Sequence, residues 1–143
     1  MTDRTNADYA AFLLRLSLGV MYLAHGLMKF VIFTPAGSAA FFEGLGLPGI
    51  IGYATLYAEI LGGLALILGV GTRLVAAALI PVLIGSIAFV HGGKGWVFSA
   101  EGGGWEYSAF LIAASLVQIL LGSGAFALRG RAGATSALTP VTA

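Results

Sequence analysis

The feature that most constrains this chain is a series of four long apolar segments. A helix needs about 20 consecutive apolar residues to cross the hydrocarbon core of a bilayer. The segments lie at residues 9–33, 50–70, 74–90 and 107–128. Of the 143 residues, 59% are hydrophobic and only 9% are charged, whereas soluble domains carry about 25% charged residues. The sequence therefore predicts an all-α integral membrane four-helix bundle, a single membrane domain over residues 1–143.

The first segment carries ionisable side chains although it has the length of a membrane helix. Arg15, Tyr22, His25 and Lys29 follow helical spacing and share one face, which we call the polar seam. The opposite face is apolar and suited to lipid. Because ionisable groups inside a membrane are costly, they usually face other helices or a wet cavity. We therefore expect the rest of the chain to supply partners for this seam.

Glu59 is the most informative residue outside the first segment. It lies some nine residues into the second segment, at a depth of roughly 14 Å for a rise of 1.5 Å per residue. A lone carboxylate there would be protonated or paired. Arg15, His25 and Lys29 are all candidate partners, and the sequence does not choose between them. The pair could fix helix register without chemistry, or it could belong to a quinone, proton or substrate site.

Further polar groups gather where the third segment ends and the fourth begins. Histidine, tyrosine and tryptophan can donate to quinone carbonyls, and carboxylates or histidines can pass protons. We therefore predict catalytic roles for Glu59, His25 and Glu106. We predict quinone binding by His91, Arg15, Lys29, Tyr22, Trp105 and Tyr107. Interface anchoring remains an equal interpretation for His91 and Trp105.

Other classes of site are weaker or excluded. The chain has no cysteine, which excludes disulfides, thiolate catalysis and cysteine-ligated metals on this chain. His25 and His91, the only histidines, could ligate haem iron axially, which is a less favoured hypothesis. No other metal site is predicted. A net charge of +1 and the lack of a basic run give no support for nucleic acid binding.

The connections and the placement of basic residues predict a topology. We expect residues 34–49 and 91–106 to form loops on one side of the membrane, the second of them with Trp96 and Trp105 at the interface. Residues 132–143 are expected to form a disordered tail. We expect the first segment to be retained and not cleaved as a signal peptide. One side of the membrane receives Arg4, Arg15, Arg73, Arg129 and Arg131, and the other receives Lys29 and Lys94. The basic bias places both termini in the cytoplasm and the loops outside.

Several motifs together resemble the DoxX family of small bacterial membrane proteins. They are RLSLGVMYLAHGLMKF in the first segment, YAEILGG with a following TR, a histidine closing the third segment, and GGWEY opening the fourth. The resemblance implies a four-helix inner-membrane protein related to the membrane subunit of thiosulfate:quinone oxidoreductase. Family members are associated with redox and thiol-stress systems, often as partners of other proteins. By likeness, the family pattern falls on Arg15, His25, Lys29, Glu59, Arg73, His91, Glu106 and Tyr107.

These observations favour an inner-membrane subunit of a quinone-linked redox system, with its site in the outer half of the bundle. Without cysteines, any sulfur relay would need a partner or the substrate's own sulfur. The main alternative is a non-catalytic anchor or scaffold for a soluble oxidoreductase. A haem-binding subunit and a small-solute transporter are less favoured. We expect lipid contact and a partner oxidoreductase subunit, and homo-oligomers are possible.

Overall fold

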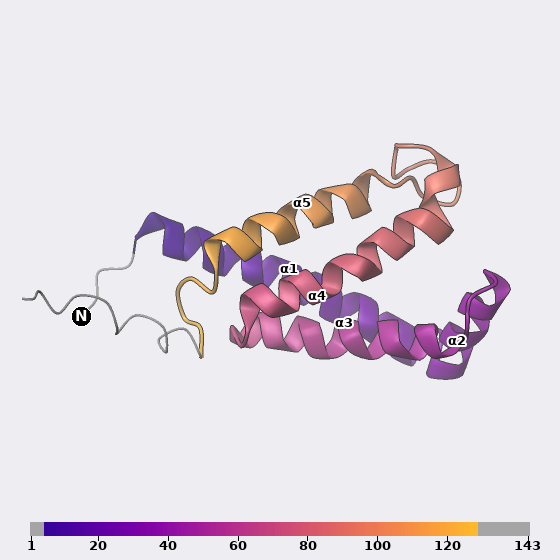
Figure 1. The fold of residues 1–143 in the computed structure, drawn as a ribbon, viewed down its shortest axis with the longest axis horizontal. Coiled ribbons are helices and arrows are strands. Elements are labelled where there is room, and N and C mark those ends of the chain that lie inside the picture. The colour runs from indigo at the N-terminus through magenta and orange to yellow at the C-terminus, as the bar shows by residue number, and fades with distance from the viewer. Residues whose placement is uncertain (1–4, 129–143) are drawn as a thin grey trace, which may run out of the picture.

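The computed structural model describes residues 5–128, which form an all-α bundle (Figure 1). Its helices are α1 (Asn6–Val31), α2 (Pro35–Gly44), α3 (Ile50–Leu68), α4 (Thr72–Gly85) and α5 (Glu106–Leu121). A π-helical turn, η1 (Ser86–His91), and a 3-10 turn, η2 (Gly92–Lys94), continue α4. No strand occurs within residues 5–128. The predicted all-α class is therefore confirmed.

Three of these helices are long and apolar enough to cross a membrane. They are α1, α3 and the continuous helix Thr72–Lys94, in which Pro81 is accommodated. At 16 residues α5 is shorter, with a length of about 24 Å at 1.5 Å per residue. The predicted lipid face of α1 is exposed, with Leu13, Val20, Leu27 and Val31 between 44% and 71% accessible. Such apolar helices with outward apolar faces belong in a bilayer, and the protein is a membrane protein.

A close helix contact joins α1 to α3 and depends on glycine. A Cβ atom at Gly63 would lie 2.6 Å from the backbone nitrogen of Leu23 and 2.8 Å from the carbonyl oxygen of Gly19. A Cβ at Gly26 would lie 2.9 Å from the backbone nitrogen of Ile60. These distances leave no room for a side chain, so the two backbones touch. Small residues allow this close packing between membrane helices, where van der Waals contact drives association.

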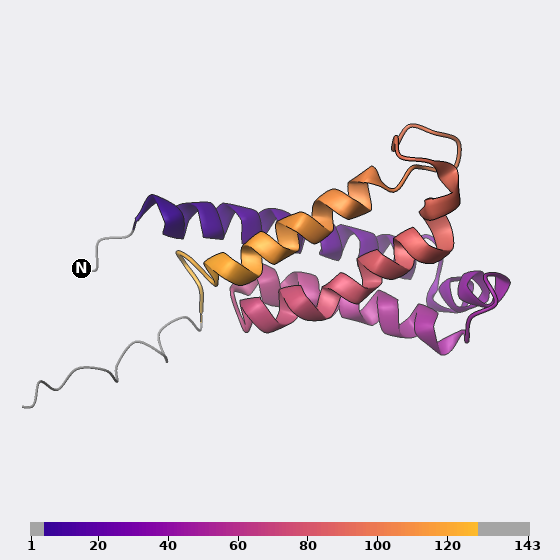
Figure 2. The same cartoon turned by 45° about the horizontal axis from the view of Figure 1, so that its top comes forward.

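The helices form two antiparallel pairs, α1 with α3 and α4 with α5. In Figure 1 α4 and α5 diverge from α1 and α3 toward the end that holds α2 and residues 95–105, and Figure 2 also shows α4 diverging from α3. We call this the cleft end and call residues 95–105 the cleft loop. The opposite end holds the start of α1, the turn at 69–71 and residues 122–128. We call it the Arg15 end.

The Glu59 carboxylate on α3 pairs with Lys29 on α1. The Lys29 Nζ lies 2.6 Å from both Oε1 and Oε2 of Glu59. The side chain of Glu59 is 6% exposed and that of Lys29 is 22% exposed. The open question of the partner is therefore decided in favour of Lys29, and the pair ties the cleft end of α1 to the middle of α3.

Arg15 has a different role from that of Lys29, because its hydrogen bonds within residues 5–128 go to carbonyl groups and not to a carboxylate. It is fully buried. Its Nη1 donates to the carbonyl oxygens of Leu66 (2.7 Å) and Ile67 (2.9 Å), and its Nη2 donates to that of Ala125 (3.0 Å). The first two carbonyls belong to the last turn of α3, which lacks the next helical turn of amides; that of Leu66 also accepts from the amide of Gly69 (3.1 Å). Arg15 thus completes the end of α3 and attaches the segment that follows α5.

The structure corrects the prediction that residues 34–49 form a loop. Residues Pro35–Gly44 are helical, as α2. The Thr34 hydroxyl accepts a hydrogen bond from the amide of Gly37 (3.1 Å), and Pro35 occupies the first turn. A threonine cap followed by proline is an ordinary helix start, and the small-residue content of this stretch obscured it. α2 packs on α3 at Gly52, where a Cβ would lie 2.6 Å from the carbonyl oxygen of Ser38.

The predicted C-terminal boundary of the fourth segment, residue 128, is also wrong. α5 stops at Leu121, and Gly122 and Gly124 adopt positive φ angles of 80° and 64°. These conformations, which glycine adopts readily, turn the chain across the Arg15 end. There the amide of Ala125 donates to the carbonyl oxygen of Asp8 (2.9 Å). The expected tail at 132–143 lies outside the described residues, as do Arg4, Arg129 and Arg131.

The glycine contact between α1 and α3 gives a first prediction. Gly63→Val should lower the free energy of unfolding by about 3 kcal/mol, because overpacking forces the backbones apart. Gly85→Ala is the matched control, since a Cβ at Gly85 meets nothing within 4 Å. The measurement is SDS titration of the protein in detergent micelles, followed by circular dichroism. Equal stability of the two variants would contradict the packing described here.

The ion pair gives a second prediction. We expect Lys29→Met and Glu59→Leu each to lower the free energy of unfolding by about 2 kcal/mol. This is somewhat less than the loss on breaking a fully buried ion pair, because Lys29 is partly exposed. The double variant should cost clearly less than the sum, since neither charge is then left alone. The same SDS titration measures all three variants. Additive losses would show that the two charges do not interact.

Candidate functional site

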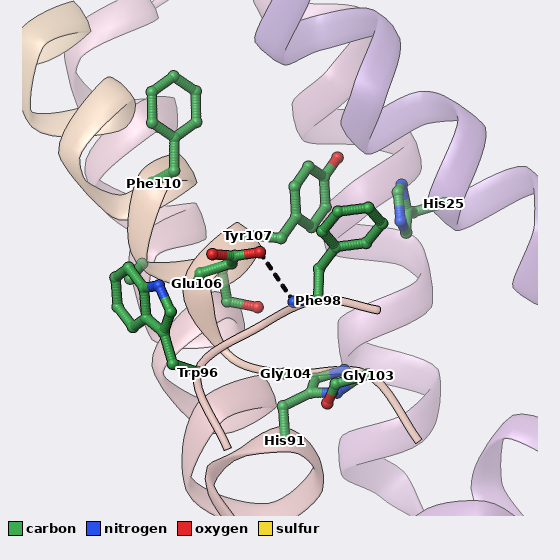
Figure 3. Close-up of a pocket in the computed structure, with 11 residues that line it drawn as sticks. His25, His91, Trp96, Phe98, Gly103, Gly104, Glu106, Tyr107 and Phe110 are labelled. Atoms are coloured by element: carbon green, nitrogen blue, oxygen red, sulfur yellow. Dashed lines mark hydrogen bonds between the residues drawn. The ribbon is translucent and has the colours of Figure 1, made fainter. Parts of the chain in front are cut away.

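A cleft of about 1040 Å³ lies at the cleft end, between α1 and the start of α5 (Figure 3). Its lining is mostly aromatic or glycine, with a few polar groups. The residues are His25, His91, Trp96, Phe98, Gly103, Gly104, Glu106, Tyr107, Ser108, Ala109 and Phe110. Ligand sites commonly combine an apolar wall of this size with a small number of placed polar groups. The rim is accessible, because Phe98 is 66% and Phe110 is 70% exposed.

Both histidines of the chain line this cleft, and both are held in the same way. The Nδ1 of His25 bonds to the carbonyl oxygen of Met21 at 2.9 Å, one turn earlier in α1. The Nδ1 of His91 bonds to the carbonyl oxygen of Gly103 at 3.0 Å. Because a carbonyl oxygen can only accept, each Nδ1 carries the proton. The Nε2 of each ring bonds to no residue within 5–128, so it can accept from a ligand when neutral and donate when protonated.

Two tryptophans and a glycine determine the conformation of the cleft loop. The rings of Trp96 and Trp105 pack edge to face, with their centroids 4.5 Å apart. The amides of Trp105 and Glu106 donate to the carbonyl oxygens of Gly95 (3.1 Å) and Trp96 (3.0 Å). A side chain at Gly104 would collide with the carbonyl oxygens of Trp96 and Val97. These contacts hold the beginning and the end of the cleft loop together at the mouth of the cleft.

Glu106 connects the cleft loop to α5. It is in the first turn of the helix, where a negative charge is favoured by the helix dipole. Its Oε1 accepts a hydrogen bond from the backbone amide of Phe98 at 2.8 Å (Figure 3). This contact fixes Phe98 over the cleft, where the ring lies beside Tyr107 in Figure 3. The second oxygen, Oε2, has no partner in the described part of the chain.

The two sides of the cleft meet where His25 faces Tyr107. Their ring centroids are 6.4 Å apart with an interplanar angle of 26°. His25 comes from α1 and Tyr107 from the first turn of α5 (Figure 3). One turn before His25 on α1, Tyr22 is 1% exposed and lies near Ser115 of α5. The bottom of the cleft therefore adjoins the polar interior of the bundle.

The structure divides the predicted site residues into three groups. His25, His91, Glu106 and Tyr107 line the cleft, and Trp105 packs on a residue that lines it. Tyr22, Lys29 and Glu59 lie behind the cleft in the bundle. Arg15 is three turns from His25, at the Arg15 end. The roles proposed for these residues in chemistry stay predictions.

Trp96, Phe98 and Phe110 also line the cleft, although the sequence did not identify them as site residues. Trp96 was assigned only to the interface. Phe98 is placed by its amide bond to Glu106, a contact eight residues apart that no periodicity indicates. Phe110 follows Glu106 by one helical turn, and this spacing could have placed it on the same face. No group of three or more possible metal ligands occurs within residues 5–128.

Comparison with known proteins agrees with the resemblance seen in the sequence. Residues 10–92 match the DoxX family model. A protein of Bacillus subtilis (strain 168) named "Putative oxidoreductase CatD" is 34% identical over 83 residues. The match covers 58% of this chain and 60% of that relative, so the chain spans about three fifths of the relative's length. No solved structure matches. With its membrane helices and the family match over more than half of its length, this chain belongs to the DoxX family.

Proposed function

We propose that this protein is a quinone-binding membrane subunit of a redox system, and that the cleft holds the quinone ring. The observation that carries the proposal is the pairing of an aromatic, exposed wall with two histidines whose Nε2 atoms have no protein partner. A quinone is a flat, apolar ring with oxygens at opposite edges. Aromatic walls suit its faces, and histidines suit its oxygens.

The histidines would bind both redox forms of such a ring. A protonated Nε2 donates to a quinone carbonyl, and a neutral Nε2 accepts from a quinol hydroxyl. Reduction of the quinone takes up two electrons and two protons, and oxidation of the quinol releases them. His25 and His91 would each transfer one proton at Nε2, with Glu106 as a third proton carrier at the same cleft. Because their Nδ1 atoms stay bonded to carbonyls, the rings keep their orientation as the protonation changes.

Electrons would come from or go to a partner oxidoreductase, whose reduced centre loses two electrons for each quinone reduced. The name of the Bacillus subtilis relative, an oxidoreductase, supports a redox setting. Because this chain has no cysteine, a thiol donor would belong to the partner or the substrate. The exposed cleft loop, with Trp96 53% and Val97 50% accessible, is the surface we propose for docking that partner.

We further propose a bacterial inner-membrane location with the Arg15 end in the cytoplasm. Arg15 and Arg73 lie at that end, and Arg4, Arg129 and Arg131 come in the sequence directly beyond the described residues Thr5 and Leu128. Lys29 and Lys94 lie at the cleft end. The excess of basic residues marks the cytoplasmic side. Both termini would then be cytoplasmic, and the cleft would open in the outer half of the membrane.

Two other functions use the same features. A scaffold needs only the Lys29–Glu59 pair and the Arg15 contacts, which stabilise the bundle without chemistry. Axial haem ligation would use the same Nε2 atoms of His25 and His91. An absorption spectrum of the purified protein tests haem ligation, because only haem gives a Soret band. The quinone titration below distinguishes a scaffold from a quinone-binding subunit.

Tryptophan fluorescence can test quinone binding, because the chain's two tryptophans both lie at the cleft. A short-chain quinone should quench the wild-type protein saturably in micelles. His25→Phe should weaken binding by roughly tenfold, since it keeps an aromatic ring but removes a hydrogen bond of about 1.4 kcal/mol. Tyr53→Phe on α3 is the control and should bind as the wild type does.

Partition of quinone into the micelle also quenches fluorescence, so N-acetyltryptophanamide in the same micelles gives the background. Quenching that never saturates, or the same affinity in His25→Phe and the wild type, would contradict a quinone site in this cleft. A protein that quenches only at background level yet keeps a stoichiometric soluble partner would be a scaffold.

A further inference from the structure

The interior of the bundle contains five buried polar atoms that make no well-formed hydrogen bond within residues 5–128, although the hydroxyls of Tyr22 and Ser115 lie near each other. These atoms are Thr72 Oγ1, Gln118 Oε1, Ser115 Oγ, Tyr22 OH and Arg15 Nε. Each belongs to a side chain that is at most 1% exposed. A buried polar group without a partner costs about 1–3 kcal/mol. Five such groups in one small membrane bundle therefore require an explanation.

The inward face of α5 is polar along most of its length. Its buried residues are Ser108, Leu111, Ala114, Ser115 and Gln118, and three of these five are polar. Ser108 is satisfied, because its hydroxyl lies 3.3 Å from that of Ser86. Gln118 is half satisfied, since its Nε2 donates to the carbonyl oxygen of Gly122 (2.6 Å) and its Oε1 stays free. Such a polar face would be unfavourable on a helix that packs only against apolar neighbours.

These groups lie at successive depths between the two ends of the bundle. Thr72 begins α4 and Arg15 binds the end of α3, so both lie at the Arg15 end. Gln118 and Ser115 are one turn apart on α5, about 4.5 Å along its axis. Tyr22 lies near Ser115 and one turn from His25, whose ring faces Tyr107. Tyr107 lines the cleft.

We propose that these side chains bind a chain of ordered water molecules that connects the Arg15 end with the cleft and with Glu59. Buried water typically makes two to four hydrogen bonds to polar groups that would otherwise be unsatisfied. Hydroxyl groups both donate and accept, so Ser115, Tyr22 and Thr72 can hold water on either side. Arg15 Nε donates and Gln118 Oε1 accepts, which gives the water near the Arg15 end a fixed orientation. We call this set of residues the polar column.

The polar column gives Glu59 access to water from the side of the membrane opposite the cleft. A proton that enters at the Arg15 end can pass through water and the hydroxyls of Ser115 and Tyr22 to the Glu59 carboxylate. This inference concerns the interior of the bundle and holds whatever ligand occupies the cleft.

X-ray hydroxyl-radical footprinting of the full-length protein in lipid nanodiscs tests the polar column. Radicals formed from bound water oxidise the side chains beside it. Tyr22, 1% exposed, should be labelled several-fold faster than Tyr57, which is 47% exposed but faces outward on the membrane helix α3. If solvent exposure of the two side chains alone set the labelling rates, Tyr57 would be labelled faster than Tyr22. Leu18 and Leu66, also buried, give the background after correction for intrinsic reactivity.

A variant pair identifies the groups that hold the water. Ser115→Ala removes one hydroxyl of the polar column and should lower Tyr22 labelling several-fold. Ser17→Ala is the matched control, because Ser17 is exposed and bonds only within its own helix. Labelling of Tyr22 at the background rate in the wild type would overturn the proposal, even if Ser115→Ala failed to fold. Unchanged Tyr22 labelling in a folded Ser115→Ala protein would also overturn it.

Discussion

The close approach of α1 and α3 is the contact on which the rest of the structure depends. Gly19, Gly26 and Gly63 bring the two backbones together, and this contact fixes the register in which charged groups can meet. Lys29 then faces Glu59 toward one end, and Arg15 faces the last carbonyls of α3 at the other. In a membrane, where helices gain little from the hydrophobic effect on association, such close packing and these polar contacts supply the stability.

The pair α4 and α5 does not follow α1 and α3 along its whole length, and the cleft forms where the two pairs separate. α4 and α5 diverge from α1 at one end (Figure 1), and His25 lies in the cleft there. It faces Tyr107 and the cleft loop across an open space. The charged residues therefore mostly hold the bundle together, whereas the groups available to a ligand are the histidines, Glu106 and aromatic rings. This separation explains how one small chain can be both rigid and open to a ligand.

Much of this architecture could be predicted from the sequence. Helical periodicity placed Arg15, Tyr22 and Lys29 on an inward face, since a charged or hydroxyl group on a lipid-facing side would be too costly. The gathering of His91, Glu106 and Tyr107 at one end followed from their positions at the ends of apolar segments, and His25 was expected there from its place in the outer half of the first segment. These inferences needed only local spacing and the depth of each residue.

The sequence could not predict features that depend on the relative rotation and tilt of helices. The choice of Lys29 over Arg15 as the partner of Glu59 depends on the α1–α3 register, which glycine contacts decide. The turn at 122–128 follows from backbone angles at Gly122 and Gly124 that spacing does not reveal. Phe98 reaches the cleft through one backbone bond to Glu106. Each of these is a tertiary effect.

Photoaffinity labelling in native membranes is the most direct test of the central claim that the cleft binds a quinone. A membrane-soluble azidoquinone should attach to peptides that contain residues 96–110 and the region of His25, and excess unlabelled quinone should prevent this. Mass spectrometry of the digested protein locates the label. Attachment spread over the lipid-facing surfaces of α1, α3 and α4, without competition by quinone, would contradict the account.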